Sequence, residues 1–214
     1  MARELLLLRH GKSDWSQDTD DFQRPLKDRG KRGAQRMGVW LLRQGLQPDY
    51  IIASPAARAI ETARKLCKTM GVDARQIKQE KRIYAASLSD LLQALGECPN
   101  KASRVLLVGH NPGLEQLRVY LSAESIPLPS DGNLLPTATL ARLILPDDWQ
   151  ELQAQSAQLQ SITRPKGLPK KFPFPDAQGE EFRDRPAYYY TQSSVIPYRI
   201  HEGELQILLV RSSQ

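Results

Sequence analysis

The amino-acid sequence predicts an α/β fold in which helices cover both faces of a mostly parallel sheet. Short apolar runs alternate with helical patterns over the first two thirds of the chain, as expected for repeated strand and helix units. The earliest runs are nearly continuous in Leu, Val and Ile, which is typical of parallel strands buried on both faces. The chain has 214 residues, 40% of them hydrophobic and 25% charged, which is enough for one folded domain and a fragment of a second.

Four apolar segments are expected to form strands of this sheet. They are Leu5–Leu8, Tyr50–Ala53, Val105–Val108 and Leu140–Leu145. The first three lack the alternation of a half-exposed strand, so we expect them at the centre of the sheet.

Four further segments predict the helices that cover the sheet. Each has apolar residues at intervals of three and four, which place one apolar stripe on a helix. The segments are Gly33–Gly45, Ala57–Met70, Leu88–Leu95 and Leu114–Leu121. Gly45 and Gly71 are plausible C-terminal stops for the first two helices.

Charge and cysteine content restrict the partners and the compartment. Thirty Lys and Arg against 24 Asp and Glu leave a net charge of +6, which suits an anionic partner without identifying it. No apolar run approaches the ~18 residues that a membrane span needs, and the N-terminus has no cleavage-site pattern. We therefore expect a cytoplasmic protein with no membrane partner. Cys67 and Cys98 are expected to be reduced core residues, since they lack the spacing of a metal site.

The composition divides the chain into three parts. Residues 1–163 carry the α/β pattern. Residues 164–186 are rich in Pro and Lys, and we interpret them as a stiff linker, although their charge and prolines leave nucleic acid or a peptide-binding partner as alternatives. In residues 187–214, two strands are expected at Tyr188–Arg199 and Leu205–Val210, joined by a hairpin turn.

Arginine and histidine residues follow three of the expected strands. Arg9 and His10 follow the first strand, Arg58 lies just beyond the second, and His110 follows the third. In open α/β sheets, ligands bind outside the carboxyl ends of the strands. We therefore expect these four side chains to meet at one edge of the sheet.

These residue types suit phosphoryl transfer. Arginine presents a planar, permanently charged fork to phosphate oxygens. A neutral imidazole can attack phosphorus and form a covalent intermediate, and we expect this role for His10, with its other ring nitrogen held by a backbone carbonyl near Gly11. His110 is expected to face the phosphate as a hydrogen-bond donor. Taken singly, each residue is also explained as an ordinary surface or capping residue, so the prediction depends on their combination.

Three motifs in this order resemble those of the histidine phosphatase superfamily, and more narrowly the small phosphohistidine phosphatases of the SixA type. The matching runs are Leu7–Trp15 with Asp21–Gly30, then Ser54–Ala63, then Val108–Glu115, and the similarity extends to Pro136–Ala138. Arg-His-Gly alone would be a weak signal, whereas the combination is specific. The resemblance covers residues 1 to about 163 and implies a three-layer sandwich of the phosphoglycerate mutase-like type.

The resemblance also implies the roles of the site residues. His10 would be phosphorylated, and Arg9, Arg24, Arg58 and His110 would form the phosphate-binding and catalytic pocket around it. A phosphate anion is the ligand expected there. The resemblance implies no metal and no cofactor.

The short segment 71–104 indicates an open site, because it has room for one connection and one helix but not for a large cap. Glu80 is the one candidate for a carboxylic general acid, although a surface Glu explains it equally well. His110 and Glu80 are the two candidates for activating the hydrolytic water.

The absence of a strong general acid favours a particular leaving group. An alkoxide leaves poorly unless it is protonated, whereas a phosphorylated imidazole can take up its own proton near neutrality, because the ordinary pKa of a histidine ring is about 6.5. We therefore expect a phosphohistidine-containing protein as substrate. The alternatives are a small-molecule phosphomonoesterase, acting on a sugar or nucleotide phosphate, and a noncatalytic module that binds phosphate or nucleic acid. Nucleic acid is the least favoured partner.

The C-terminal segment resembles the opening hairpin of a Nudix domain. The match comprises Ala187–Arg199 and Leu205–Arg211. The Glu-rich Nudix box that binds a divalent metal is absent from the sequence, so no pyrophosphohydrolase activity is expected. The hairpin is expected either to be part of a truncated Nudix domain or to pack on the phosphatase domain or a partner. The sequence leaves the oligomeric state open.

Overall fold

A six-stranded sheet forms the middle layer of the structure, a computed structural model that describes residues 3–122, 132, 134–169, 198–201 and 204–207. The strands are β1 (Arg3–Arg9), β2 (Tyr50–Ala53), β3 (Ile77–Gln79), β4 (Arg104–Gly109), β5 (Leu140–Leu145) and β6 (Gln158–Thr163). Their order is β3-β2-β4-β1-β5-β6. The first four strands in that order run parallel, and β5 is antiparallel to both of its neighbours. The sheet is therefore mostly parallel, as predicted.

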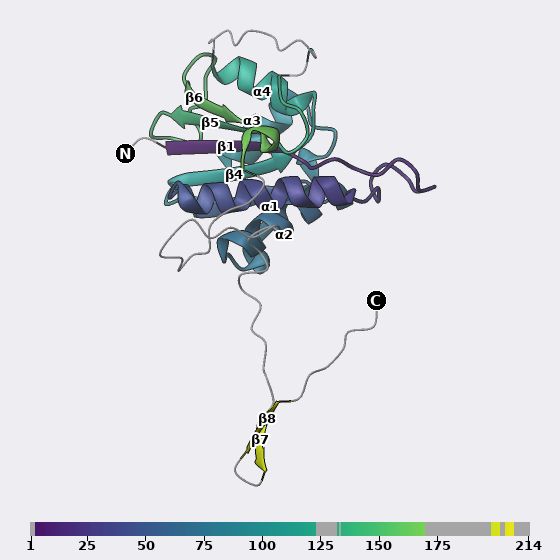
Figure 1. Ribbon diagram of the computed structural model, residues 1–214. Helices are drawn as coiled ribbons and strands as arrows, with labels where there is room; N and C mark the ends of the chain where they lie inside the picture. The colour runs from purple at the N-terminus through teal and green to yellow at the C-terminus, as the bar shows by residue number, and fades with distance from the viewer. Residues whose placement is uncertain (1–2, 123–131, 133, 170–197, 202–203, 208–214) are drawn as a thin grey trace.

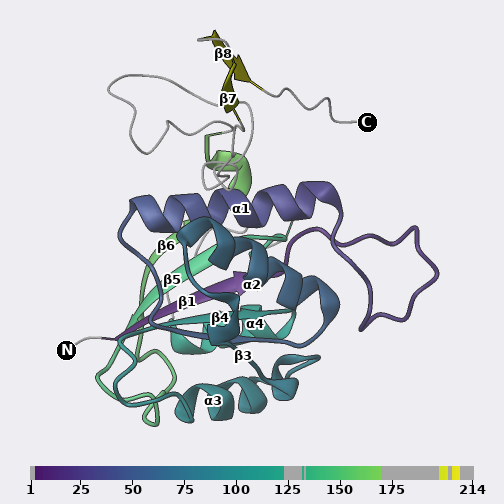
Figure 2. The ribbon, with the colours of Figure 1, turned by 90° about the horizontal axis from the view of Figure 1, so that it is seen from below.

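Two pairs of helices cover the two faces of the sheet (Figures 1 and 2). The helices α1 (Asp28–Arg43) and α2 (Ala57–Met70) lie on one face, and α3 (Leu88–Gly96) and α4 (Gly113–Leu121) lie on the other. Alternate residues of β1 point to the two cores, with Leu6 and Leu8 packing toward α1 and α2, and Leu5 and Leu7 toward α3 and α4. This confirms the predicted three-layer sandwich.

The structure differs from the prediction at one helix end and at two edge strands. The first helix begins at Asp28 rather than Gly33, because its first turn is polar and carries no apolar periodicity. The strand β3 has a single buried residue, Ile77, and β6 is polar with no buried residue. Neither strand therefore gives the apolar signal that marks the central strands.

No cap domain is inserted in the described residues between α2 and β4. This stretch holds only β3, α3 and two short 3-10 turns, η1 (Ala74–Gln76) and η2 (Lys81–Ile83). Cys67 and Cys98 are buried and unpaired, as predicted. Among the residues that the structure describes, no helix has both the length and the apolar character needed to cross a membrane.

The beginning of the expected linker packs against the sandwich. A 3-10 turn, η3 (Pro165–Gly167), contacts α1, where Pro165 lies near Gly33. Residues 170–186 of that linker lie outside the described residues. Two antiparallel strands, β7 (Tyr198–His201) and β8 (Glu204–Ile207), fall within the expected C-terminal hairpin. The remainder of the expected hairpin, at 188–197, 202–203 and 208–210, also lies outside the described residues.

Candidate functional site

The register of the central strands brings the motif residues to one edge of the sheet. Arg9 pairs with Gly109 across β1 and β4, and the backbone N–H of His10 donates to the carbonyl of Gly109 at 3.0 Å. On the other side of β4, the N–H of Ser54 donates to the carbonyl of Val108 at 2.9 Å. The rings of His10 and His110 consequently lie 5.0 Å apart between centroids. The convergence that strand order alone suggested is present in the structure.

The turn after β1 fixes the orientation of the His10 ring. Nδ1 of His10 lies 2.7 Å from the carbonyl oxygen of Gly11. A carbonyl only accepts, so Nδ1 carries the proton and donates it, and Nε2 keeps its lone pair. Thr62 stabilises this turn, because its Oγ1 accepts a hydrogen bond from the N–H of Gly11 at 2.9 Å. A Cβ at Gly11 would lie 2.7 Å from the carbonyl oxygen of Gly30, so the close approach of these two segments requires glycine.

Burial keeps the His10 ring neutral. The residue is 7% exposed, and desolvation, followed by the nearby His110, lowers its pKa to about 3. The hydrogen bond to Gly11 opposes this shift, whereas the charges of Arg58 and Arg9 add to it. Near neutral pH, Nε2 of His10 is therefore unprotonated, and its lone pair is available for nucleophilic attack.

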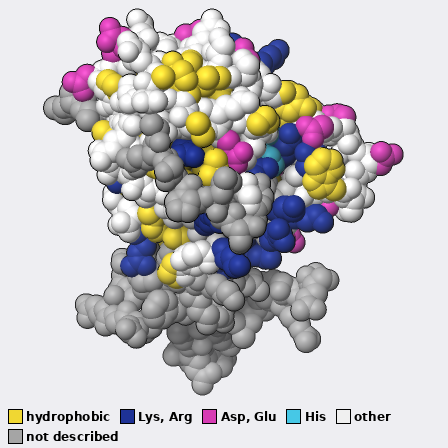
Figure 3. Space-filling model, turned by 90° about the horizontal axis from the view of Figure 1, so that it is seen from above, with side chains coloured by type: hydrophobic (Ala, Val, Ile, Leu, Met, Phe, Trp, Pro, Cys, Tyr) yellow, Lys and Arg dark blue, Asp and Glu magenta, His cyan; other side chains and the backbone are white. Residues whose placement is uncertain are grey.

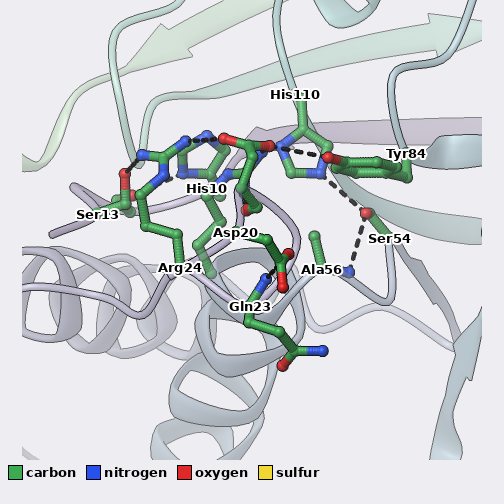
Figure 4. A network of polar contacts seen from close by, with 12 residues as sticks. His10, Ser13, Asp20, Gln23, Arg24, Ser54, Ala56, Tyr84 and His110 are labelled. Carbon is green, nitrogen blue, oxygen red and sulfur yellow. Dashed lines mark hydrogen bonds and ion pairs between the residues drawn. The ribbon is translucent and has the colours of Figure 1, made fainter. Parts of the chain in front are cut away.

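A hydroxyl group orients His110. Nε2 of His110 lies 2.8 Å from Oγ of Ser54 (Figure 4). The same Oγ accepts from the backbone N–H of Ala56 at 3.3 Å, and its own proton, being buried, needs an acceptor. Nε2 of His110 supplies that acceptor, which leaves the proton of the ring on Nδ1. Burial, followed by the charge of Arg58, lowers the pKa of His110 to about 3.

Nδ1 of His110 is buried and has no hydrogen-bond partner among the described residues. In the tautomer that Ser54 favours, this atom is a donor without an acceptor. A phosphate oxygen bound beside the ring would supply the missing acceptor.

A carboxylate joins the two most deeply buried arginines of the site. Arg24 and Arg58 are 7% and 5% exposed, and they form ion pairs with Oδ1 and Oδ2 of Asp21, respectively. The hydroxyl of Tyr84 also donates to Oδ2 of Asp21, at 2.9 Å. The hydrogen bond from Arg24, together with those from Tyr84 and Arg58, holds the pKa of Asp21 well below its usual range. The two cations are thus pre-arranged around an acidic group.

The side chain of Arg9 contacts the segment that precedes β5. Its Nη1 donates to the carbonyl of Leu135 at 2.8 Å, and the side chain is half-buried. Its charge contributes to the lowered pKa of both His10 and His110, which is consistent with a place close to both rings.

Glu80 is held away from the acid role by an ion pair. Its carboxylate accepts from Nε and Nη2 of Arg82 at 3.0 and 2.9 Å and from the backbone N–H of Arg82 at 3.1 Å, where it caps η2. These contacts, the side-chain hydrogen bond of Arg82 first among them, lower the pKa of Glu80 to about 2. The carboxyl group is therefore ionised near neutral pH, and this arrangement favours the structural interpretation of the residue.

A small cavity of about 270 Å³ opens in front of His110. Its lining includes Arg58, Asp21 and Tyr84, together with residues 111–113 of the turn before α4. Within the described part of the chain, no group of three His, Cys, Asp or Glu side chains is arranged to hold a metal ion.

Four residues of the site were given no role by the sequence interpretation. They are Asp21, Ser54, Thr62 and Tyr84. Asp21 stands three residues before Arg24, and Ser54 directly follows a predicted strand, so position along the chain gave a weak signal for both. Tyr84 reaches the site from the turn after β3, and nothing in its local sequence indicates that contact.

Comparisons with known proteins agree with this geometry. A family model described as the histidine phosphatase superfamily (branch 1) matches residues 5–84. An uncharacterized protein of Mycobacterium tuberculosis is 27% identical over 163 residues, which cover 74% of this chain and 100% of that protein.

Two solved structures extend the comparison to the fold. A Nakamurella multipartitia protein named as a SixA phosphohistidine phosphatase is 29% identical, with a TM-score of 0.65 over 77% of this chain and 97% of that one. A mycobacterial glucosyl-3-phosphoglycerate phosphatase is 20% identical, with a TM-score of 0.51 over 74% and 97%. The second similarity concerns the fold alone, and that fold is therefore found with more than one named substrate.

Proposed function

We propose that this chain, which has the sequence motifs and the fold of the histidine phosphatase superfamily, is a phosphatase that works through a phosphorylated His10. The observation that carries the proposal is the contact between Nδ1 of His10 and the carbonyl of Gly11. It leaves Nε2 unprotonated, and the depressed pKa of the ring keeps it so near neutrality. A noncatalytic phosphate-binding module has no need of an imidazole prepared in this way.

The proposed reaction has two steps. Nε2 of His10 attacks the phosphorus atom, the bond from phosphorus to the leaving group breaks, and the leaving group departs with the electron pair. Water then attacks phospho-His10, which releases inorganic phosphate and restores the imidazole. Arg24 and Arg58 would bind the phosphoryl oxygens in place of Asp21, with Arg9 at the other side.

His110 would act as a donor in both steps. Its Nδ1 proton, fixed by Ser54, would bind an oxygen of the phosphoryl group while negative charge moves during the transfer. The two rings lie close together, so His110 could donate to an oxygen of the same phosphoryl group whose phosphorus His10 attacks.

The carboxyl groups of the site bear on the substrate class. Asp21 lines the cavity, but its pKa lies well below the usual range, and Glu80 is ion-paired to Arg82. A carboxylic acid must keep its proton in order to deliver it to a leaving alkoxide. Neither of these two groups keeps its proton near neutral pH, so the site favours a leaving group that needs no such acid.

Phosphohistidine in a protein meets this requirement, and we infer that it is the substrate class. The imidazole of histidine has an ordinary pKa of about 6.5, far below that of an alcohol, so it departs without a strong acid. The opening is small, and the described residues between α2 and β4 hold no cap domain, which also suits a side chain presented by a protein. A phosphate monoester of a sugar or nucleotide is the alternative substrate. Its leaving group is an alkoxide, which needs a protonated acid in the site.

Turnover of substrates with graded leaving groups tests this proposal. A phosphohistidine peptide, a series of substituted phenyl phosphates and glycerol phosphate would be compared, with His10→Ala as the matched control. We expect a steep fall of kcat/KM as the leaving-group pKa rises, and an acid-labile phosphoryl label on the wild type alone. Comparable turnover of glycerol phosphate and phosphohistidine would contradict the substrate class. Turnover that persists in His10→Ala would contradict the mechanism.

A further inference from the structure

A second cavity, of about 540 Å³, lies beside the His10 turn, between α1 and η3. We call it the α1 groove. Its wall near the site includes Lys12, two residues beyond His10, and Ala138, whose N–H donates to the carbonyl oxygens of Arg9 and His10 at 3.1 and 3.0 Å. The groove therefore borders the candidate site without including either histidine among its lining residues.

Six basic side chains line the α1 groove. They are Lys12, Arg29, Arg32, Arg36, Arg164 and Lys166. No Asp or Glu stands among the described residues that line it. Figure 3 shows Lys and Arg side chains gathered beside the visible histidine on this side of the molecule.

The local structure places these cations on facing walls. Arg29, Arg32 and Arg36 are spaced by three and four residues on α1, so they lie along one face of the helix, over a rise of about 10 Å. The opposite wall is formed by η3 and the segment at 136–139. The two walls meet closely at Gly33, where a Cβ would lie 3.3 Å from Cβ of Ala138 and 3.7 Å from Cγ of Pro165.

The three arginines that α1 contributes to the groove differ from Arg24 and Arg58 in having no carboxylate partner among the ion pairs of the described residues. Arg24 and Arg58 each form an ion pair with Asp21. In the ion pairs found among the described residues, by contrast, none involves Arg29, Arg32 or Arg36. Nε of Arg36 is buried without a hydrogen-bond partner in that part of the chain. An anion would relieve the mutual repulsion of these charges and supply acceptors.

We propose that the α1 groove binds an oligophosphate, either an inorganic chain of three or more phosphates or the phosphate chain of a nucleoside polyphosphate. A row of cations about 10 Å long matches several linked phosphates better than one. The volume of the groove lies in the usual range of small-molecule sites, about 300 to 1,000 Å³. Such a concave site favours a compact ligand over an acidic protein surface. Binding there does not depend on His10, so the inference is independent of the proposed reaction.

Isothermal titration with sodium tripolyphosphate tests the inference, in the presence of EDTA and at physiological salt. The groove variant is Arg32→Gln/Arg36→Gln. The control is Arg43→Gln/Arg64→Gln, which removes the same charge from exposed positions outside the groove on α1 and α2. We expect the groove variant to weaken binding at least about tenfold and the control to change it less than about twofold. A second groove variant, Arg32→Gln/Lys166→Gln, repeats the test if the first one unfolds at a lower temperature than the control.

Further arms of the same titration identify the ligand and its place. His10→Ala should bind tripolyphosphate as tightly as the wild type, and inorganic phosphate should bind more weakly than tripolyphosphate in the groove. Equal affinity for ATP and tripolyphosphate would support recognition of the phosphate chain, and tighter binding of ATP would support a nucleoside-bearing ligand. Equal losses in the groove and control variants would overturn the proposal, as would loss of binding in His10→Ala. Tighter binding of a poly-glutamate peptide than of tripolyphosphate would also overturn it, in favour of an acidic protein partner.

Discussion

Oγ of Ser54 lies 2.8 Å from Nε2 of His110, and this contact favours the tautomer in which Nδ1 carries the ring proton. In the proposed reaction, that proton would be donated to the phosphate. Ser54 is fully buried at the end of β2. In the proposed reaction its hydroxyl would act only through His110, which would make Ser54 a positioning residue. Without the hydroxyl, the His110 ring would be free to adopt either tautomer, and one of them presents a lone pair to the phosphate.

We therefore expect Ser54→Ala to lower kcat roughly tenfold to a hundredfold, which is less than the loss of about 10²–10³ for a complete oxyanion donor. The measurement is steady-state turnover together with ¹⁵N NMR of the His110 ring, which reports the tautomer directly. Ser16→Ala, at an exposed serine outside the cavity, is the control and should match the wild type. An unchanged kcat and an unchanged tautomer in Ser54→Ala would show that the contact has no role in positioning.

Asp21 is expected to compete with phosphate for the two buried arginines. Two like charges about 5 Å apart repel by roughly 1 to 3 kcal/mol at an effective dielectric constant between 80 and 20. Asp21→Asn should therefore lower the inhibition constant of inorganic phosphate about threefold to tenfold, since a carboxylate that faces the anion is lost. The matched control is Asp18→Asn, an exposed position on the same loop. Weaker phosphate inhibition in Asp21→Asn than in Asp18→Asn would mean that Asp21 positions the arginines rather than competing with the anion.

The two buried histidines should make stability depend on pH below neutrality. Their folded-state pKa values are about 3, against an ordinary value of 6.5. Between these pH values the two histidines are protonated in the unfolded chain and unprotonated in the folded chain. The free energy of unfolding should therefore fall as the pH drops below about 6.5, by up to about 1.4 kcal/mol per pH unit for each histidine. Above that range the histidines contribute no slope.

Urea unfolding at pH 7 and pH 5 measures this dependence. The wild type should lose more stability between the two pH values than His10→Gln or His110→Gln, by up to about 2 kcal/mol for each replaced ring. The carboxylates of the protein, Asp21 among them, are present in every variant and cancel in the comparison. The same loss in all three proteins would show that neither ring is kept neutral by the fold.

The sequence predicted the central part of the fold because buried strands consist of nearly continuous apolar residues. The strands β2 and β5 begin and end at the residues predicted for them, as does α2, since each is bounded by a change from apolar to polar or turn-forming residues. The strand β6 lies at the sheet edge and has only two apolar residues, Leu159 and Ile162, which are partly buried against the core, so its sequence resembles a loop. The first turn of α1 is solvated, so it gives no periodic signal.

The candidate site divides in the same way. His10 and His110 follow strands directly, and Arg58 lies in the first turn of the helix after β2, so strand order is sufficient to bring them together. Asp21 and Tyr84 come from loops whose course depends on tertiary packing. The sequence contains both residues, but their contact joins segments 63 positions apart, and local pattern has no information about it. Glu80 is the opposite case. Its position in the sequence suggested a general acid, but in the structure its carboxylate forms an ion pair with Arg82.

The contact between α1 and α2 leads to the last prediction, which concerns stability. Gly38 of α1 faces α2 so closely that a Cβ would lie 2.7 Å from the carbonyl oxygen of Leu66 and 2.0 Å from Oγ1 of Thr69. Thr69 already donates its hydroxyl proton to that carbonyl at 2.8 Å, so neither neighbour moves freely. Gly38→Ala should therefore cost about 1 to 3 kcal/mol through overpacking, against a gain of up to about 1 kcal/mol from helix propensity.

Gly96→Ala is the matched control for this substitution, because Gly96 ends α3 and its Cβ would meet nothing closer than 3.8 Å. We expect the urea midpoint to fall for Gly38→Ala and to stay the same or rise slightly for Gly96→Ala. Since α1 carries Gly30 against the turn that holds His10, a displaced α1 should also lower phosphoenzyme formation in the Gly38 variant. A Gly38→Ala protein as stable as the wild type would mean that α1 and α2 separate at little cost, and that their close contact does not fix the position of the His10 turn.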